Sequence, residues 1–308
     1  GGAGRKALEI EWPSLSIDLI AQFSGGHLTG LKPASFMWTA HSTRELAKQL
    51  EAKHGRTASP THISNLLKQL GFRIRRDPRV KPLHTVKDRQ AQFGLTFKAM
   101  QQAMAVGQAV LVLDIEKRHW SHCAVDSSQS DEKLLVQSLQ ENGAWDLAEP
   151  DAHSAAFALD VVQRWWDQEG SDRFAANGEL LVCATGFEQE GDLQDYWINK
   201  LATAARELKT AIRYCHIPVG ITRVGPVVSQ PVSLLRMRNG SGSVVSHKVT
   251  LSVLPQYFGA PDLSYVSGFD SSSIPPRWRV PSKELKSINI RRDMEMGHWN
   301  FSVGQKPS

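Results

Sequence analysis

The sequence has few of the features that mark secreted or membrane proteins. It holds only three cysteines, Cys123, Cys183 and Cys215, an odd number in apolar surroundings, which favours reduced thiols over a disulfide framework. It has no run of about 18 apolar residues and no charged-then-apolar leader with a cleavage site. We therefore expect neither membrane insertion nor secretion, and we expect a cytoplasmic protein.

Acidic residues are missing from one long stretch. Between Leu208 and Pro261 there is no Asp or Glu, whereas the same stretch holds six basic residues: Lys209, Arg213, Arg223, Arg236, Arg238 and Lys248. Such a segment offers no carboxylate to a divalent cation, but it can face phosphate. The sequence also lacks a glycine-rich phosphate loop after a strand and a GxSxG nucleophile motif.

The composition indicates a folded protein whose N-terminal third is basic. The chain has 308 residues, of which 41% are hydrophobic and 22% charged, enough for one large core or two modest ones. Residues 1–93 contain 15 Lys and Arg against 7 Asp and Glu, a net charge of +8, while the remainder has a net charge of −3. This division is typical of a module that binds a polyanion.

Two short helices are predicted in the basic part. In residues 42–55, Ser42 can cap the first helix, Glu45 completes a capping box, and Gly55 ends it. In residues 58–72, Ser59 is a natural N-cap and Pro60 suits the first helical position. Two helices joined by a brief turn form a candidate helix-turn-helix region.

The second helix and the segment after it carry candidate DNA-binding residues. Its outward positions are Thr61, His62, Ser64, Asn65 and Lys68, mostly short hydrogen-bonding side chains that can reach base edges in a major groove. A basic arm follows, with Arg73, Arg75, Arg76, Arg79 and Lys81 on a path stiffened by proline. An ordinary helical hairpin with a solvated polar face is the simpler alternative.

The rest of the chain alternates helices and strands. A helix is expected from Asp88 to Gly107, and a helix with an apolar face is expected to end at Gly170. Between them, Val110–Leu113 is a continuous apolar run, as in a strand covered on both faces, and Asp114 follows it. A second buried strand, LLVCA, ends at Thr185, and IRYCHIPV is a further strand. The pattern predicts an α/β architecture.

Several segments together resemble a known family. They are GGAGRKAL, HSTRELAKQL, HISNLLKQLGF, DRQAQF, AVLVLD, SAAFALDVVQRWWDQEG, YCHIPVGI and VPSKELKSINIRRDMEMGHWNFSV, which occur in the same order over most of the chain. They resemble the Rhodopirellula-type DDE transposases of bacterial insertion sequences. The resemblance implies an α/β fold with an RNase H-like mixed sheet and flanking helices, preceded by an all-α helix-turn-helix domain. It also implies metal-dependent cutting and joining of DNA.

The resemblance implies three catalytic carboxylates, and only the first is present. Two-metal chemistry needs carboxylates from separate elements that converge on ions about 3.5–4 Å apart. Asp114 occupies the first position. Thr185 stands where the second acid belongs, and the third falls near Val228, where Pro226 and Pro231 make a helix doubtful. Asp114 is then a vestige, and Glu116, Glu188, Glu190 and Asp192 are the remaining acids that could substitute.

We therefore predict residues 1–82 as a helix-turn-helix region with a basic arm, 83–107 as a connecting helix, and 108–308 as a degenerate RNase H-like domain. The main hypothesis is a catalytically inactive, transposase-derived protein that binds double-stranded DNA in a sequence-specific way and regulates transcription. It would be nucleoid-associated, would form a homodimer or higher oligomer, and would need no cofactor. An active transposase or nuclease, which would need Mg²⁺, and a protein-interaction module with incidental DNA binding are the alternatives.

Overall fold

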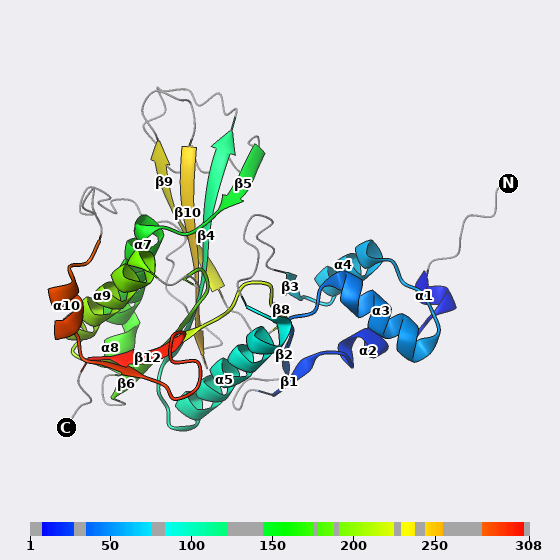
Figure 1. Cartoon of the computed structure of the whole chain (residues 1–308), viewed down its shortest axis with the longest axis horizontal. Helices are drawn as coiled ribbons and strands as arrows, with labels where there is room; N and C mark the ends of the chain where they lie inside the picture. The colour runs from blue at the N-terminus through cyan, green and yellow to red at the C-terminus, as the bar shows by residue number, and fades with distance from the viewer. Residues whose placement is uncertain are drawn as a thin grey trace. The chain divides into compact units, whose positions relative to one another are not determined.

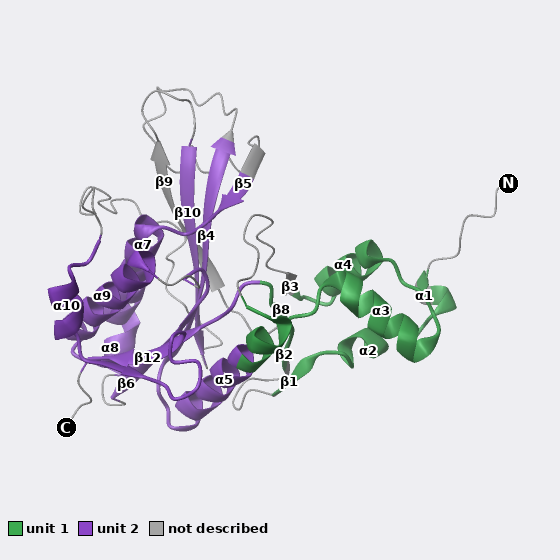
Figure 2. Cartoon of the chain, viewed as in Figure 1, with its two compact units in different colours: residues 1–76, 84–91, 220–226 green, residues 77–83, 92–219, 227–308 purple. Residues whose placement is uncertain are grey.

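A computed structural model describes residues 8–27, 35–74, 84–121, 144–174, 178–187, 191–224, 229–237, 244–254 and 279–304. The chain divides into two compact units, shown in Figure 2. Unit 1 comprises residues 1–76, 84–91 and 220–226, and unit 2 comprises residues 77–83, 92–219 and 227–308. The helix α5 (Val86–Ala105), expected from the sequence, contributes its first residues to unit 1 and the rest to unit 2.

Unit 1 contains the two predicted helices. They are α3 (Thr43–His54) and α4 (Pro60–Gln69), which follow α1 (Leu8–Glu11) and α2 (Leu15–Ile20). The caps form as the sequence predicts, because the Ser42 side chain accepts a hydrogen bond from the Glu45 N–H and the Ser59 side chain accepts one from the His62 N–H.

One apolar core holds these helices together. It joins Trp12 and Leu19 to Leu46, Leu50 and Leu67, all of which are buried. Every residue of this core lies between residues 8 and 72, so the helical part of unit 1 buries its apolar side chains against one another.

Unit 1 is not all-α, which corrects the expectation from the sequence. It also has a four-stranded sheet in the order β1-β2-β8-β3. The strands are β1 (Ser24–His27), β2 (Ser35–Thr39), β3 (Arg73–Ile74) and β8 (Thr222–Val224). β1 and β2 pair with each other locally, but β8, which joins β2 to β3, comes from a segment about 150 residues after β3, so no local pattern in residues 1–82 can predict that connection.

Unit 2 is built on a mixed eight-stranded sheet. Its order is β11-β12-β7-β6-β4-β10-β9, and β5 also pairs with β4. The strands are β4 (Val110–Ser121), β5 (Ala144–Ala148), β6 (Glu179–Ala184), β7 (Ala211–His216), β9 (Ser229–Met237), β10 (Val244–Leu254), β11 (Ile290–Arg292) and β12 (Asn300–Val303). β4, β6 and β7 are parallel neighbours, and the other pairs are antiparallel.

Helices cover the sheet of unit 2. α7 (Ala152–Trp165) and α9 (Asp192–Glu207) bury their apolar sides with the sheet in one core, which includes Phe157, Trp165 and Leu201, each 0% exposed. Helix α5 is tied to β7 and β12, because Gln92 donates to the His216 carbonyl at 2.8 Å and to the Asn300 side chain at 2.7 Å. The mixed sheet with helices packed on it is consistent with an RNase H-like fold.

The helix predicted to stop at Gly170 runs further. It continues as a π-helical turn, Trp166–Gly170, and then as α8 (Ser171–Phe174). A side chain at Gly170 would lie 2.8 Å from the Trp165 ring, so glycine is needed here for space and does not end the helix. The last helix, α10 (Ser282–Ser287), lies beside α9 in Figure 1.

The start of α7 is anchored by a polar cluster. The Asp151 carboxylate caps the helix through the Ser154 N–H, pairs with Lys117 at 2.8 Å, and lies 3.9 Å from the His247 ring. Burial by itself would raise the pKa of Asp151, but the attraction of His247 and Lys117 and the hydrogen bond from Ser154 outweigh it and lower the pKa to about 2. Asp151 therefore connects α7 to the β4–β10 strand pair.

Candidate functional site

The fold places Asp114 and Thr185 next to each other. One edge of β4 pairs with β10 from Val110 to Trp120. The other edge is shared, because β6 pairs with Val110–Leu113 and β5 pairs with Lys117–Ser121. Asp114 does not end its strand, which corrects the expectation from the sequence, because β4 continues to Ser121. It lies level with the carboxyl ends of the parallel strands β6 and β7, the edge where catalytic groups are expected in such a sheet.

Thr185 binds the part of this β4 edge that lies between the segments paired with β6 and β5. Its N–H donates to the Leu113 carbonyl at 3.2 Å, and its hydroxyl oxygen accepts from the Ile115 N–H at 3.2 Å. The hydroxyl also lies 3.5 Å from the Leu113 carbonyl, to which it donates. Thr185 is 2% exposed. The Thr185 side chain therefore forms hydrogen bonds with the backbone of the residues on both sides of Asp114.

This arrangement makes a stability prediction for Thr185. Replacing it by valine, which has nearly the same shape, would leave the buried Ile115 N–H without its acceptor. We expect the free energy of unfolding to fall by about 1–3 kcal/mol. Thr185→Ser keeps the hydroxyl and should cost clearly less. Urea denaturation of both variants measures the difference, and equal costs would show that the hydroxyl does not contribute.

The acids and bases around Asp114 largely offset one another. Asp114 lies between Leu113 and Ile115, which point into the core, so its side chain is on the opposite face of the sheet. On that face Glu116 pairs with Arg118 at 2.7 Å, and Lys248 is directly opposite Glu116 in the β4–β10 register. The nearest second acid on β4 is thus already held by one cation and stands across from another.

No helix carries the third position in the described part of the chain. Val228 itself lies outside the described residues. The residues that follow it, Ser229–Met237, form strand β9, which pairs with β10. A strand here agrees with the doubt that Pro226 and Pro231 cast on a helix.

The described residues do not fit a pair of divalent ions. Two-metal chemistry needs several carboxylates around one point, and no group of three or more His, Cys, Asp or Glu that could hold an ion occurs among the residues that the structure describes. Glu188 and Glu190 lie outside those residues. Asp192, the next acid, begins α9 and pairs with Arg279 at 2.5 Å.

The candidate DNA-reading residues lie on α4. Thr61, Asn65 and Lys68 are exposed, whereas His62 and Ser64 are half-buried. The apolar residues Ile63, Leu66 and Leu67 face the core of unit 1. The outward side of the helix is therefore the predicted one, and it has the hydrogen-bonding groups that reading a major groove requires.

The basic arm is described only at its start. Arg73 belongs to β3, whose backbone pairs with β8. Arg75, Arg76, Arg79 and Lys81 lie outside the described residues. Sequence reasoning missed β8, and its three residues carry no periodic signal that could have revealed it.

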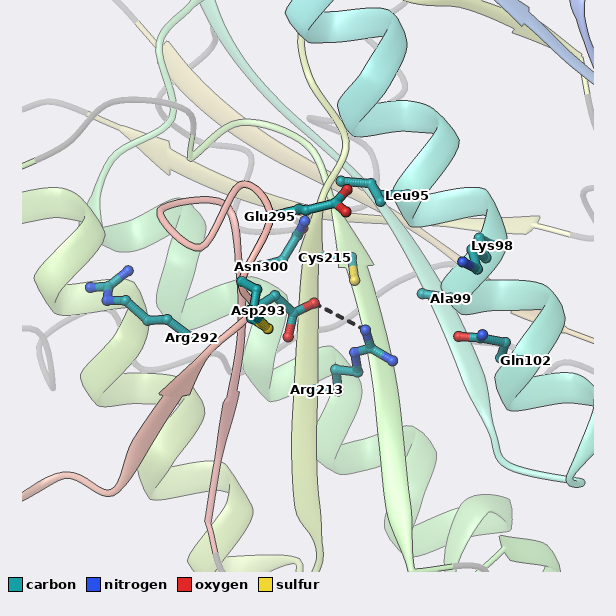
Figure 3. A pocket seen from close by; sticks show the side chains of 11 residues that line it. Leu95, Lys98, Ala99, Gln102, Arg213, Cys215, Arg292, Asp293, Glu295 and Asn300 are labelled. Carbon is teal, nitrogen blue, oxygen red and sulfur yellow. Dashed lines mark hydrogen bonds and ion pairs between the residues drawn. The ribbon is translucent and has the colours of Figure 1, made fainter.

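A hollow of about 430 Å³ opens elsewhere in unit 2 (Figure 3). Its walls come from α5, β7 and the turn before β12, and an ion pair between Arg213 and Asp293 at 3.0 Å crosses it. Burial alone would lower the pKa of Arg213, but Cys215 and Asp293 outweigh it and raise the pKa. The hollow is lined by neither Asp114 nor Thr185, so it is separate from the candidate site.

Comparison with known proteins identifies a family. The family model described as Rhodopirellula transposase DDE domain matches residues 26–124 and 134–305. Neither the curated proteins nor the solved structures contain a match. Within the described ranges, no helix has both the length and the apolar character needed to span a bilayer.

Proposed function

The chain belongs to the Rhodopirellula transposase DDE-domain family, and from that premise we propose that it binds double-stranded DNA at specific sequences without cutting it, as a regulator of transcription. The supporting observation is the hydrogen bonding of the Thr185 side chain. A threonine at the second acid position, with its hydroxyl bonded to the backbone beside Asp114, stabilises the sheet and offers no charge to a metal ion.

DNA binding is supported by the exposed face of α4. Asn65 is suited to pair with an adenine edge, and Lys68 is suited to contact a phosphate. The charge of residues 1–93, +8, attracts a polyanion. Two copies bound to paired sites would form a homodimer on DNA, as the two ends of a mobile element suggest.

The experiment that tests the proposal selects DNA bound by the full chain from a random pool, with and without Mg²⁺ or Mn²⁺. We expect an enriched motif and intact DNA in both conditions. A supercoiled plasmid that carries the motif should also stay intact with each metal. Nicking that Asp114→Ala abolishes would overturn the proposal in favour of an active nuclease, the alternative that family membership supports.

A matched pair of variants tests whether α4 reads bases. Asn65→Ala should lower affinity for the selected motif roughly 10-fold and leave affinity for unrelated DNA unchanged, because a base contact contributes about 1–3 kcal/mol of discrimination. Gln69→Ala, an exposed position at the end of the same helix, should change neither. If no DNA is bound at low salt, the protein-interaction alternative replaces the proposal.

A further inference from the structure

The segment from Arg279 to Arg292 is strongly basic and mostly exposed. It contains Arg279, Lys283, Lys286, Arg291 and Arg292 and a single acid, Glu284. The segment forms α10 and β11 and belongs entirely to unit 2, far along the chain from α4 and the basic arm. Neither the sequence patterns nor the family resemblance draws attention to it as a binding surface.

Three apolar residues of this segment pack against the core. Val280, Ile288 and Ile290 are the residues that pack against the core beneath α7 and α9. Because side chains alternate along a strand, Arg291 lies on the face opposite to Ile290. Lys283 and Lys286 are three positions apart and therefore share one side of α10. All three cations are exposed.

The nearby acids are already held by other groups. Glu284 accepts a hydrogen bond from Asn199 of α9 at 2.7 Å, Asp192 pairs with Arg279, and Asp293 pairs with Arg213. Arg292 is also engaged, since it donates to the Gly297 carbonyl at 2.9 Å. Lys283, Lys286 and Arg291 have no ion pair within the described part of the chain.

Arg291 lies on the last strand of a sheet, and Lys283 and Lys286 lie on the helix that precedes this strand. β11 is the outermost strand of the unit 2 sheet and pairs only with β12 among the described strands. In Figure 1, α10 lies beside α9, and the Asn199–Glu284 hydrogen bond confirms this contact. We call Lys283, Lys286 and Arg291 the basic edge. The basic edge places three exposed cations on a helix and on the outermost strand of a sheet, where they can contact the backbone of a duplex.

We propose that the basic edge is a second DNA-contacting surface, which binds phosphates of double-stranded DNA without reading bases. The inference rests on the proposed DNA binding and adds a site on unit 2 to the one on α4. Three phosphates neutralised at this edge would strengthen binding to any sequence and would leave the preference for the selected motif unchanged. The simpler role of edge lysines and arginines, protection against strand-to-strand aggregation, needs no DNA.

The test removes the three charges in the full chain. The variant Lys283→Gln/Lys286→Gln/Arg291→Gln is compared with Lys98→Gln/Arg164→Gln/Arg173→Gln, which removes the same net charge from exposed or half-exposed positions on α5, α7 and α8. Affinity for the selected motif and for unrelated DNA is measured by fluorescence anisotropy from 50 to 300 mM salt. Thermal melting verifies that both variants are folded.

The basic-edge variant should bind both DNAs roughly 10- to 100-fold more weakly at about 0.15 M salt, with the log–log salt slope smaller by about 2–3, because each phosphate contact contributes about 0.9. The control variant should keep nearly the full slope. Equal losses of DNA affinity in the two variants would contradict the proposal that the basic edge contacts DNA. So would a basic-edge variant that aggregates yet binds DNA normally, the result expected from edge protection. If the wild-type chain binds neither DNA, the proposed function itself fails.

Discussion

Replacing Trp197 by alanine should lower the free energy of unfolding of unit 2 by about 4 kcal/mol, as for other large buried side chains cut back to alanine. Trp197 is 1% exposed. Its ring stacks on Phe187 with centroids 4.4 Å apart and meets Tyr214 edge-on at 5.6 Å. The variant therefore removes apolar burial and two aromatic contacts at once.

The loss of packing around Trp197 should also affect the candidate site, because Phe187 follows Thr185 by two residues and is itself buried. Phe187→Ala and the double variant complete a cycle, in which we expect a coupling of about 0.5–1.5 kcal/mol. Met294→Ala is the control, since Met294 is fully exposed and should change stability little. Urea denaturation, followed in the transition of unit 2, measures all four. A cost below about 1 kcal/mol for Trp197→Ala would show that the loop after β6 does not depend on this packing.

Local patterns predicted the helices and central strands well. The N-caps Ser42 and Ser59 form because a short hydroxyl side chain and the following backbone N–H are neighbours in sequence. The start of β4, Val110–Leu113, was recognisable because a strand covered on both faces is continuously apolar, but its continuation to Ser121 was not predicted. Such signals depend only on residues a few positions apart, so one sequence is enough to detect them.

Non-local pairing could not be predicted in the same way. β8 joins β2 and β3 through only three residues, Thr222–Val224, and so completes a four-stranded sheet in the unit whose N-terminal region was expected to be all-α. The hydroxyl of Thr185 bonds to the backbone of β4, 70 positions earlier. The resemblance predicts an acid at this position, but the sequence could not show which backbone groups the threonine binds instead.

The candidate site combines both kinds of information. The resemblance predicts Asp114 and Thr185 at the first and second catalytic positions, and the parallel β4–β6 pairing brings these two residues together. The lack of acids from Leu208 to Pro261 is a property of the sequence alone. The structure adds that Glu116 is paired with Arg118 and that a strand follows position 228. Together these observations leave Asp114 without a second available carboxylate among the described residues, and for this reason we propose binding without cleavage.

We expect the second large effect on folding stability when the charge of Asp151 is removed. Asparagine caps helices as well as aspartate does, so Asp151→Asn should keep the cap on α7 and lose the attraction to Lys117 and His247. The folded-state pKa of about 2 lies below the ordinary 3.8. This carboxylate therefore stabilises the fold fully above about pH 4, and its contribution is lost as the pH falls toward 2.

At pH 7 the Asp151→Asn variant should be about 2 kcal/mol less stable than the wild type, because one pKa unit corresponds to about 1.4 kcal/mol and the side chain is partly solvated. The difference should shrink between pH 4 and pH 2, where the wild type loses its charge. Asp160→Asn, which breaks an ordinary pair with Arg164 on the surface of α7, should cost only a few tenths of a kcal/mol at pH 7. Urea titrations of the three proteins across this range measure both quantities. Equal stability of the wild type and Asp151→Asn at pH 7 would show that Asp151 acts as a helix cap alone, and that its charge does not tie α7 to the β4–β10 pair.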